Sequence, residues 1–306
     1  MRILIAGAGA TGGYFGARLS QAGRDVSFLV RPRRAEQLRD GLKLIGPGGE
    51  EETVAVRTVE ADQITDPYDV VIIAVKAGAL TSALEQIAPA VGPGTLILPF
   101  LNGMAHMTEL NRRFGAERVL GGLVRVVTTV TGSGAIHQMK PIATMDFGPQ
   151  DGLATGRLEA VREQLDVPGY ELAFTTDIVD AMWKKWTFIT AAGVITCLMR
   201  GSIGDIIAAG GKPFIDQVIA ETEGVAAAAG HQVTAPEHDA TVHMLTEPGS
   251  VFTASLYRDV AAGLPHEGEH LLGSFAETAA GLGLDVPLTN LALLQLRTHD
   301  QAAARA

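Results

Sequence analysis

Short apolar runs alternate with helix-like segments over the first half of the chain. The runs are "RILIAG", "DVSFLV", "YDVVIIAV" and "TLILPFLNG", and a helical pattern from Thr11 to Ala22, closed by Gly23, follows the first. Continuous apolar strands separated by helices are typical of a parallel sheet covered on both faces. A polar segment lies between the second and third runs. The pattern predicts a doubly wound α/β domain.

The hydrophobic pattern changes twice after this region. From "GLVRVVTTV" through "IATMDFG" it indicates extended chain, with Gly132 and Gly134 at a turn, and we expect these strands to extend the edge of the sheet. From about Asp177 the spacing is helical and alanine-rich, with breaks at "GGKP", "APEH", "EPGS" and "GLP". We therefore expect a Rossmann-type domain over residues 1–170 and an all-helical domain over residues 171–306.

Length, charge and cysteine content narrow the class of protein. A chain of 306 residues is long enough for two domains, and its net charge of -10 makes a nucleic-acid partner a poor expectation. The single cysteine, Cys197, excludes an internal disulfide and lies in an apolar run, where we expect it to be buried. We expect a soluble, cytoplasmic protein without a membrane partner, since neither a signal peptide nor an apolar run of membrane-spanning length is present.

The sequence "GAGATG" carries the first chemical signal. It places Gly7, Gly9 and Gly12 directly after a predicted strand and at the start of a predicted helix. In this context the first glycine permits a tight turn, the second lets backbone approach a pyrophosphate, and the third brings helix and strand together. The partial positive charge of the helix N-terminus favours phosphate. The motif predicts a dinucleotide site.

The residues after the second strand indicate which dinucleotide is bound. An NAD site typically has a carboxylate about 20 residues beyond the glycines, to hold the ribose 2′-hydroxyl. This chain has Arg31 there, followed by Arg33 and Arg34. Guanidinium groups suit a 2′-phosphate, so we expect NADPH as the cofactor. The alternative is that the three arginines are solvated residues at a helix start.

Polar residues follow two further strands, and two lysines lie in an aromatic segment. Lys76 follows "VVIIAV" and Asn102 follows "LILPFL". Ligands of open α/β sheets bind beyond the carboxyl ends of strands, so both residues are candidates for the same cleft.

Lys184 and Lys185 lie in "WKKW", where a lysine is costly unless it is paired, functional or extended toward solvent.

The sequence "PHEGEH" raises a separate hypothesis. It matches H-E-x-x-H, in which two histidines hold zinc and the glutamate acts as general base. Pro265 and Gly268, however, are typical of a helix start rather than of the middle of a zinc-binding helix, and no third ligand stands out downstream. We expect no metal, and we interpret His266 and His270 as solvent-facing or substrate-rim residues.

In combination, these residues resemble the ketopantoate reductase family over nearly the whole chain. The matching residues are Gly7, Gly9, Gly12, Arg31, Lys76 in "AVK", Asn102 in "LNG", Lys185 in "WKKW", Ser255 in "SLYRD", and Glu267. The resemblance implies a Rossmann domain joined to a helical domain, with NADPH and a 2-oxo acid as ligands. It implies reduction of ketopantoate (2-dehydropantoate) to pantoate, a step of pantothenate biosynthesis. A homodimer is one candidate assembly.

The resemblance also implies roles for individual residues. Lys185 matches the general acid, Glu267 a substrate-contacting carboxylate, Ser255 the serine that holds the substrate carboxylate, and Asn102 a residue near the nicotinamide and the lysine. The cofactor-binding set it implies is Gly7, Gly9, Ala10, Thr11, Gly12, Arg31, Lys76, Asn102 and Glu267. An ammonium group can stabilise and then protonate the oxygen that gains charge when hydride arrives at a ketone.

Two positions depart from the family pattern. The family has asparagines four and eight residues after its lysine, on the same helix face, where this chain has Ile189 and Gly193. One interpretation is a local shift in which Thr190 or Thr196 supplies the hydrogen bonds. A second is a paralogue that reduces a different 2-oxo acid or ketone. A third is an NADPH-binding sensor with little turnover.

Overall fold

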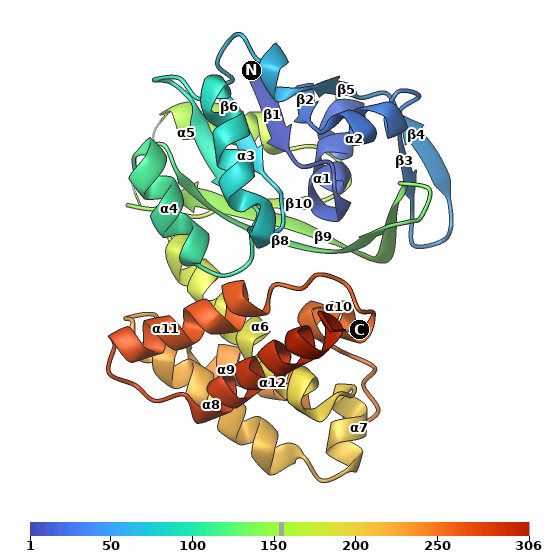
Figure 1. Ribbon diagram of the computed structural model, residues 1–306. Coiled ribbons are helices and arrows are strands. Elements are labelled where there is room, and N and C mark those ends of the chain that lie inside the picture. The colour runs from blue at the N-terminus through green and yellow to red at the C-terminus, as the bar shows by residue number, and fades with distance from the viewer. Residues whose placement is uncertain (153–155, 306) are drawn as a thin grey trace. The chain divides into compact units, whose positions relative to one another are not determined.

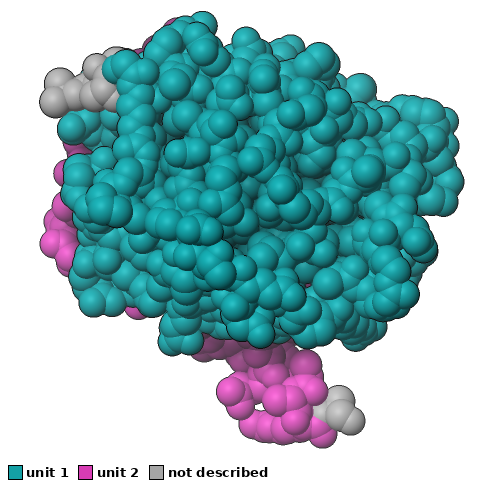
Figure 2. All heavy atoms as spheres, turned by 90° about the horizontal axis from the view of Figure 1, so that it is seen from above, with its two compact units in different colours: residues 1–101, 106–179 teal, residues 102–105, 180–306 magenta. Residues whose placement is uncertain are grey.

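The computed structural model describes residues 1–152 and 156–305. The chain forms two compact units: one comprises Met1–Leu101 and His106–Val179, and the other Asn102–Ala105 and Asp180–Ala306 (Figure 2). The expected boundary at residues 170/171 is therefore too early, because the strand Glu171–Phe174 pairs with a strand of the first unit. The short segment Asn102–Ala105 was also not expected to group with the helical unit.

A five-stranded parallel sheet forms the first part of the N-terminal unit (Figure 1). Its order is β5-β2-β1-β6-β7. The strands are β1 (Arg2–Ala6), β2 (Asp25–Leu29), β5 (Arg57–Val59), β6 (Val70–Ile73) and β7 (Leu96–Pro99). The central strands β1 and β6 are buried at nearly every position, which is why they read as continuous apolar runs. This confirms the α/β parallel sheet expected from the sequence.

A second five-stranded sheet corrects the expectation of an extended sheet edge. It consists of β3 (Leu42–Ile45), β4 (Glu51–Val54), β8 (Leu120–Val130), β9 (Ile136–Pro149) and β10 (Glu171–Phe174). Strands β8 and β9 form the expected hairpin around Gly132 and Gly134, but β9 pairs with β3 and β10. An isolated bridge from Ile97 to Val119 lies between β7 and the residue before β8. The polar segment after β2 supplies β3, β4 and β5.

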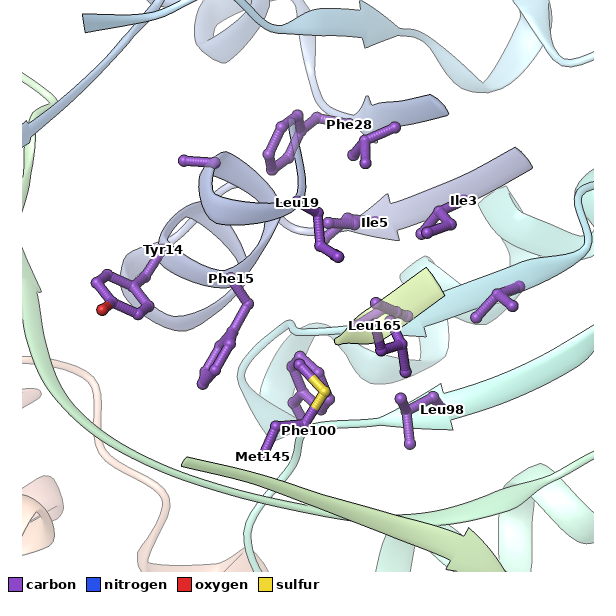
Figure 3. Close-up of a cluster of buried hydrophobic side chains, with 14 of the residues drawn as sticks. Ile3, Ile5, Tyr14, Phe15, Leu19, Phe28, Leu98, Phe100, Met145 and Leu165 are labelled. Carbon is purple, nitrogen blue, oxygen red and sulfur yellow. The ribbon is translucent and has the colours of Figure 1, made fainter. Parts of the chain in front are cut away.

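Helix α1 (Ala10–Gln21) contacts strands of both sheets. Its glycines make this close approach possible: a Cβ on Gly13 would lie 3.0 Å from the Ile136 side chain of β9, and a Cβ on Gly16 would lie 2.5 Å from Ile5 of β1. Phe15 extends from α1 toward Phe100 and Met145 in the core, and its ring is 5.4 Å from that of Phe100 (Figure 3). The glycine motif therefore opens a helix that is fixed by packing.

Shorter helices complete the N-terminal unit. They are α2 (Pro32–Gln37), η1 (Ala61–Gln63), η2 (Ala77–Ala79), α3 (Leu80–Ile87), η3 (Ala88–Ala90), α4 (Ala105–Phe114) and α5 (Gly156–Leu165).

The C-terminal unit is built from helices, as expected. They are α6 (Ile178–Met199), α7 (Ile203–Ala208), α8 (Lys212–Ala228), α9 (Ala235–Thr246), α10 (Ser255–Ala261), the π-helical turn η4 (Glu269–Gly273), α11 (Ser274–Gly281) and α12 (Pro287–Ala303). Two buried apolar clusters hold them, and residues 191–197 of α6 are entirely buried. Cys197 is among these residues, and burial raises the pKa of its thiol to about 12. Among the described residues no helix is long and apolar enough to cross a membrane.

Candidate functional site

A pocket of about 400 Å³ lies in the N-terminal unit, beyond the carboxyl ends of β1, β2 and β6. Its lining consists of residues 6–9, residues 29–31, Arg34, Gln37, Val75, Ala79, Ser82, Ala83, Gln86 and Val130. This is the position in which open α/β sheets bind ligands. Gly7, Gly9 and Arg31, which the sequence nominates, all line the pocket.

Each of the three glycines of "GAGATG" has a different structural role. Gly7 has φ +108°, and a Cβ there would lie 2.8 Å from the carbonyl oxygen of Ala74, while a Cβ on Gly12 would overlap the carbonyl oxygen of Gly7. A Cβ on Gly9 would meet no described atom within 4 Å. The protein itself therefore requires the first and third glycines. The second leaves open space at the pocket, which fits a pyrophosphate that must approach the backbone.

Ala10 and Thr11, the other nominated residues of this loop, open α1 and are not among the pocket-lining residues. Their backbone belongs to the first helical turn, where amide groups have no partner within the helix. Gly12 lies behind the loop, packed on Ala74. Lys76 is the exposed N-cap residue of η2 and directly follows the pocket residue Val75.

Arg34 has a larger part in this pocket than its sequence position indicates. Its Nε donates to the carbonyl oxygen of Ala8 at 3.1 Å, and its Nη1 donates to the carbonyl oxygen of Gly134 at 2.9 Å. Its Nη2 is buried and has no hydrogen-bond partner among the described residues. Burial lowers the pKa of this guanidinium. A buried, unsatisfied N–H of a cation is costly, and an anionic ligand would satisfy it. The pocket therefore fits a ligand that carries phosphate groups.

In the helical unit the adjacent lysines of α6 differ in their surroundings. Lys184 Nζ lies 2.7 Å from Asp180 Oδ2 and 2.8 Å from Glu237 Oε1 of α9, and these hydrogen bonds raise the pKa of its ammonium group. Lys184 is thus committed to a structural ion-pair network. Lys185 is half-buried and points in another direction around the helix, about 100° away.

Apolar side chains cover the face of α6 that follows Lys185. A Cβ on Gly193 would lie 3.3 Å from Leu256 Cδ2 and 3.6 Å from Leu272 Cδ2, and Ile189 packs in the apolar cluster of Trp186. Leu256 directly follows Ser255, which is exposed at the start of α10. The side chains of neighbouring segments therefore fill the space beside position 193.

Neither threonine takes the place of the expected asparagines. Thr196 Oγ1 donates to the carbonyl oxygen of Ala192 at 2.6 Å, within its own helix. Thr190 is completely buried, and its hydroxyl has no hydrogen-bond partner in the described part of the chain. Thr190 also lies about 140° around the helix from Lys185. The interpretation of a shift to these residues gains no support from their positions.

The "PHEGEH" segment is the start of a helix, as Pro265 and Gly268 predict. Residues 264–267 are not helical, and the carbonyl oxygen of half-buried Glu267 accepts a hydrogen bond from the amide of Leu271 at 2.9 Å. His266 Nε2 lies 2.8 Å from Asp300 Oδ1, with its side chain only 9% exposed. His270 Nε2 lies 2.8 Å from the carbonyl oxygen of Asn102. The solvent-facing interpretation is wrong for His266, whose side chain is largely buried, while a place for either histidine at the substrate rim stays a prediction.

No group of three or more histidine, cysteine, aspartate or glutamate side chains that could hold a metal ion exists among residues 1–152 and 156–305. The two histidines of the motif bind different partners in the helical unit. The H-E-x-x-H match is therefore one of sequence and not of geometry.

The elements that carry the candidate catalytic residues meet around α6. Trp186 Nε1, next to Lys185, donates to the carbonyl oxygen of Leu271 at 3.1 Å in η4, which follows Glu267. Leu256 of α10, the residue after Ser255, packs beside Gly193 of α6. The hydrogen bond from His270 to the carbonyl oxygen of Asn102 holds the Asn102 turn beside η4. Three separate segments thus pack on the helix that carries Lys185.

Comparison with known proteins identifies the family of this chain. The family model described as "Ketopantoate reductase PanE/ApbA" matches residues 3–152, and the model of the C-terminal part of that family matches residues 177–300. The chain belongs to the ketopantoate reductase family. It is therefore a member of an oxidoreductase family whose fold comprises a Rossmann-type domain and a helical domain.

Individual relatives of the ketopantoate reductase family differ in what they are named for. The chain is 33% identical over 301 residues to an uncharacterized oxidoreductase, YkpB, of Bacillus subtilis, covering 98% of this chain and 99% of that one. A 2-dehydropantoate 2-reductase structure from Geobacter metallireducens is 26% identical with a TM-score of 0.87, covering 97% and 99%. D-mandelate dehydrogenase with NADH and anilino(oxo)acetate, at 19% identity, 99% and 100% coverage and a TM-score of 0.87, shares the fold. The family therefore includes 2-dehydropantoate 2-reductases, and its fold is shared with a dehydrogenase named for another substrate.

Proposed function

We propose that this chain is an NADPH-dependent reductase that converts a 2-oxo acid to a 2-hydroxy acid. The observation that carries the proposal is the packing of three segments, bearing Ser255, Glu267 and Asn102, on helix α6, which bears Lys185. The family supplies the class of reaction. The pocket of the N-terminal unit, which the glycine loop lines beyond the carboxyl ends of the strands, supports a nicotinamide cofactor.

Arginine residues of the pocket favour NADPH over NADH. Arg31 and Arg34 both line the pocket, and no carboxylate is among the residues that line it. The buried Nη2 of Arg34 is suited to the 2′-phosphate, and the open space at Gly9 to the pyrophosphate. Lys76 follows a pocket residue and provides a further positive charge.

The protein residues have distinct tasks in the reaction. When bound, NADPH supplies the hydride. Lys185 stabilises the charge on the ketone oxygen through its ammonium group and donates a proton to it. The carboxylate of Glu267 contacts the substrate, and the hydroxyl of Ser255 binds the substrate carboxylate. Asn102 orients the reactants beside Lys185. The two partners are thereby held in one geometry, which accounts for a large part of the rate.

Ketopantoate is the first candidate substrate, because the family is named for its reduction. A second candidate, a 2-oxo acid with an apolar side chain, is favoured by a specific observation. Where the family pattern has two amides, this chain has Ile189 in an apolar cluster and Gly193 under Leu256 and Leu272. A terminal hydroxyl of the substrate has no amide partner at these two positions.

Turnover of a panel of 2-oxo acids with NADPH, followed by the absorbance of the reduced nicotinamide, tests the proposal. We expect at least one member to be reduced with kcat/KM of about 10⁴ M⁻¹ s⁻¹ or more. Slow turnover of every member, with tight NADPH binding, would instead support a sensor.

A matched pair of substrates distinguishes the two candidates. Ketopantoate is compared with the 2-oxo acid of the same branching that lacks the terminal hydroxyl. Because apolar contacts discriminate weakly, we expect the two values of kcat/KM to differ by less than about 10-fold. A preference of a thousandfold for ketopantoate would assign it as the substrate and contradict the apolar candidate.

A further inference from the structure

The second histidine of "PHEGEH" contacts a turn that is 168 residues away in sequence. His270 Nε2 lies 2.8 Å from the carbonyl oxygen of Asn102. A carbonyl oxygen can only accept, so the ring nitrogen carries the proton and donates. His270 and Asn102 are both half-buried. A contact between elements so distant in sequence fixes a position that local chain geometry alone does not determine.

The Asn102 turn is held on the helical unit by packing as well as by this bond. Gly103 has φ +80°, and a Cβ there would lie 3.4 Å from Trp186 Nε1 and 3.5 Å from Leu271 Cδ2. Met104 packs in the apolar cluster of Trp186 and Leu271. The segment Asn102–Ala105 consequently groups with the helical unit, although the strand that precedes it belongs to the other unit.

The element that presents His270 has an uncommon backbone. Residues 269–273 form a π-helical turn, a conformation that occurs mostly as single turns at functional sites. Ser274 Oγ donates to the carbonyl oxygen of His270, and the carbonyl oxygen of Leu271 accepts from Trp186 Nε1. Side chains thus satisfy two carbonyl groups of this turn. The turn presents the ring of His270 to Asn102 while its own backbone is anchored to α6.

We propose that His270 is a positioning residue that holds the Asn102 turn on the same rigid unit as Lys185 and Glu267. The importance of this position rests on the proposed function, in which Asn102 orients the reactants. His270 acts through Asn102 and touches neither reactant. Displacing a positioning group by about 1 Å can cost about 100-fold in rate, so a single hydrogen bond at this place is consequential.

The kinetic test compares His270→Ala and His270→Gln with the wild-type enzyme. His270→Ala should lower kcat by about 10- to 100-fold while KM changes less than about threefold, because positioning is needed mainly in the transition state. The amide of His270→Gln can donate in place of the ring nitrogen and should restore kcat to within about fivefold of the wild type. His238→Ala, which removes an exposed histidine bound to Glu223, is the matched control and should leave kcat unchanged.

A second readout does not depend on turnover. The chain has two tryptophans, so Trp183→Phe leaves Trp186 as the only fluorescent indole, directly beside Gly103. In this background His270→Ala should raise quenching of Trp186 by acrylamide about twofold or more, because the turn opens locally, whereas His270→Gln and His238→Ala should not.

The possible outcomes separate this proposal from the proposed function. If glutamine is as damaging as alanine, or if alanine leaves both kcat and quenching unchanged, His270 does not position the turn. If the wild-type enzyme reduces no 2-oxo acid, the proposed function fails, and the quenching series alone then decides whether His270 holds the Asn102 turn.

Discussion

Lys184 and Lys185 are neighbours in sequence with opposite expected tasks. Lys184 is bound by Asp180 and Glu237, whereas Lys185 is our candidate for the general acid. We predict that Lys185→Ala lowers kcat by about 100-fold or more and leaves the Kd of NADPH nearly unchanged. Lys184→Ala should keep kcat within about threefold of the wild type but lower the unfolding temperature. Steady-state kinetics and thermal unfolding of both variants check this, and the reverse order of kcat would assign the general acid to Lys184.

Two arginines are expected to share the recognition of NADPH. Arg31→Ala and Arg34→Ala should each reduce the preference for NADPH over NADH by about tenfold, or about 1.4 kcal/mol, because each removes a guanidinium from the pocket. Arg34→Ala should also lower the affinity for NADH somewhat, since Arg34 donates a hydrogen bond to the Ala8 carbonyl of the glycine loop. Arg33, exposed and not part of the pocket lining, offers a matched control in Arg33→Ala. If fluorescence titrations show that a variant loses the same factor of affinity for NADPH and for NADH, the replaced arginine has no role in binding the 2′-phosphate.

At the scale of elements, Gly193 shows how α6 is fitted against its neighbours. Gly193→Ala should raise the free energy of unfolding by about 0.5–1 kcal/mol, because alanine favours the helix and only the flexible end of Leu256 must shift. Gly193→Asn places a larger polar side chain against Leu256 and Leu272, and should lower the free energy of unfolding by about 1–3 kcal/mol. Denaturant unfolding of both variants measures the difference. A stabilising asparagine would mean that this face of α6 has room for the amide of the family pattern.

The ion pair between α6 and α9 predicts a pH dependence of stability. Burial raises the pKa of Glu237, but hydrogen bonds from Lys184 and Thr234 outweigh it and lower the pKa to about 2 from the ordinary value of 4.5. A carboxylate with a depressed pKa stabilises the fold above the unfolded-state pKa and loses this contribution as the pH falls through the folded-state value. The contribution should therefore be complete above pH 4.5 and disappear toward about pH 2.

Lys184→Ala isolates this contribution. Without the lysine the pKa of Glu237 should return toward its ordinary value, so the variant has less stability to lose in acid. We predict that the difference in unfolding temperature between wild type and Lys184→Ala narrows as the pH is lowered from about 7 to about 3. A difference that stays constant over this range would show that the ion pair contributes little, as is common for partly exposed pairs.

At the scale of the whole molecule, the sequence predicts the parallel sheet, the helical unit and the glycine loop, because each is encoded locally. Buried parallel strands read as apolar runs, and the glycines are required by contacts within a few residues or with the adjacent strand. The second sheet was not predicted, since the short, partly polar strands β3 and β4 pair with each other but join the sheet only through the pairing of β3 with distant β9. Strand partners over such separations depend on tertiary packing, which a local pattern does not contain.

The candidate site was predictable to a similar extent. Its residue types follow from motifs and from the family resemblance, and the structure brings the elements that carry Ser255, Glu267 and Asn102 onto α6, the helix of Lys185. The roles of Arg34 and His270 were missed, because their decisive partners, Gly134 and Asn102, are 100 and 168 residues away. The spacing of the histidines in "HEGEH" alone suggests a zinc site, whereas Pro265 and Gly268 indicate the helix start that the structure shows.

Transfer of deuterium tests the central claim most directly. NADPH with both hydrogens of the hydride-donating carbon of its nicotinamide replaced by deuterium is incubated with the protein and each 2-oxo acid, and the product is examined by mass spectrometry. We predict a 2-hydroxy acid that carries the deuterium on its hydroxyl-bearing carbon, with formation lowered about 100-fold or more in Lys185→Ala. The absence of labelled 2-hydroxy acid from every member of the panel, with NADPH bound, would contradict the assignment of this chain as a 2-oxo acid reductase.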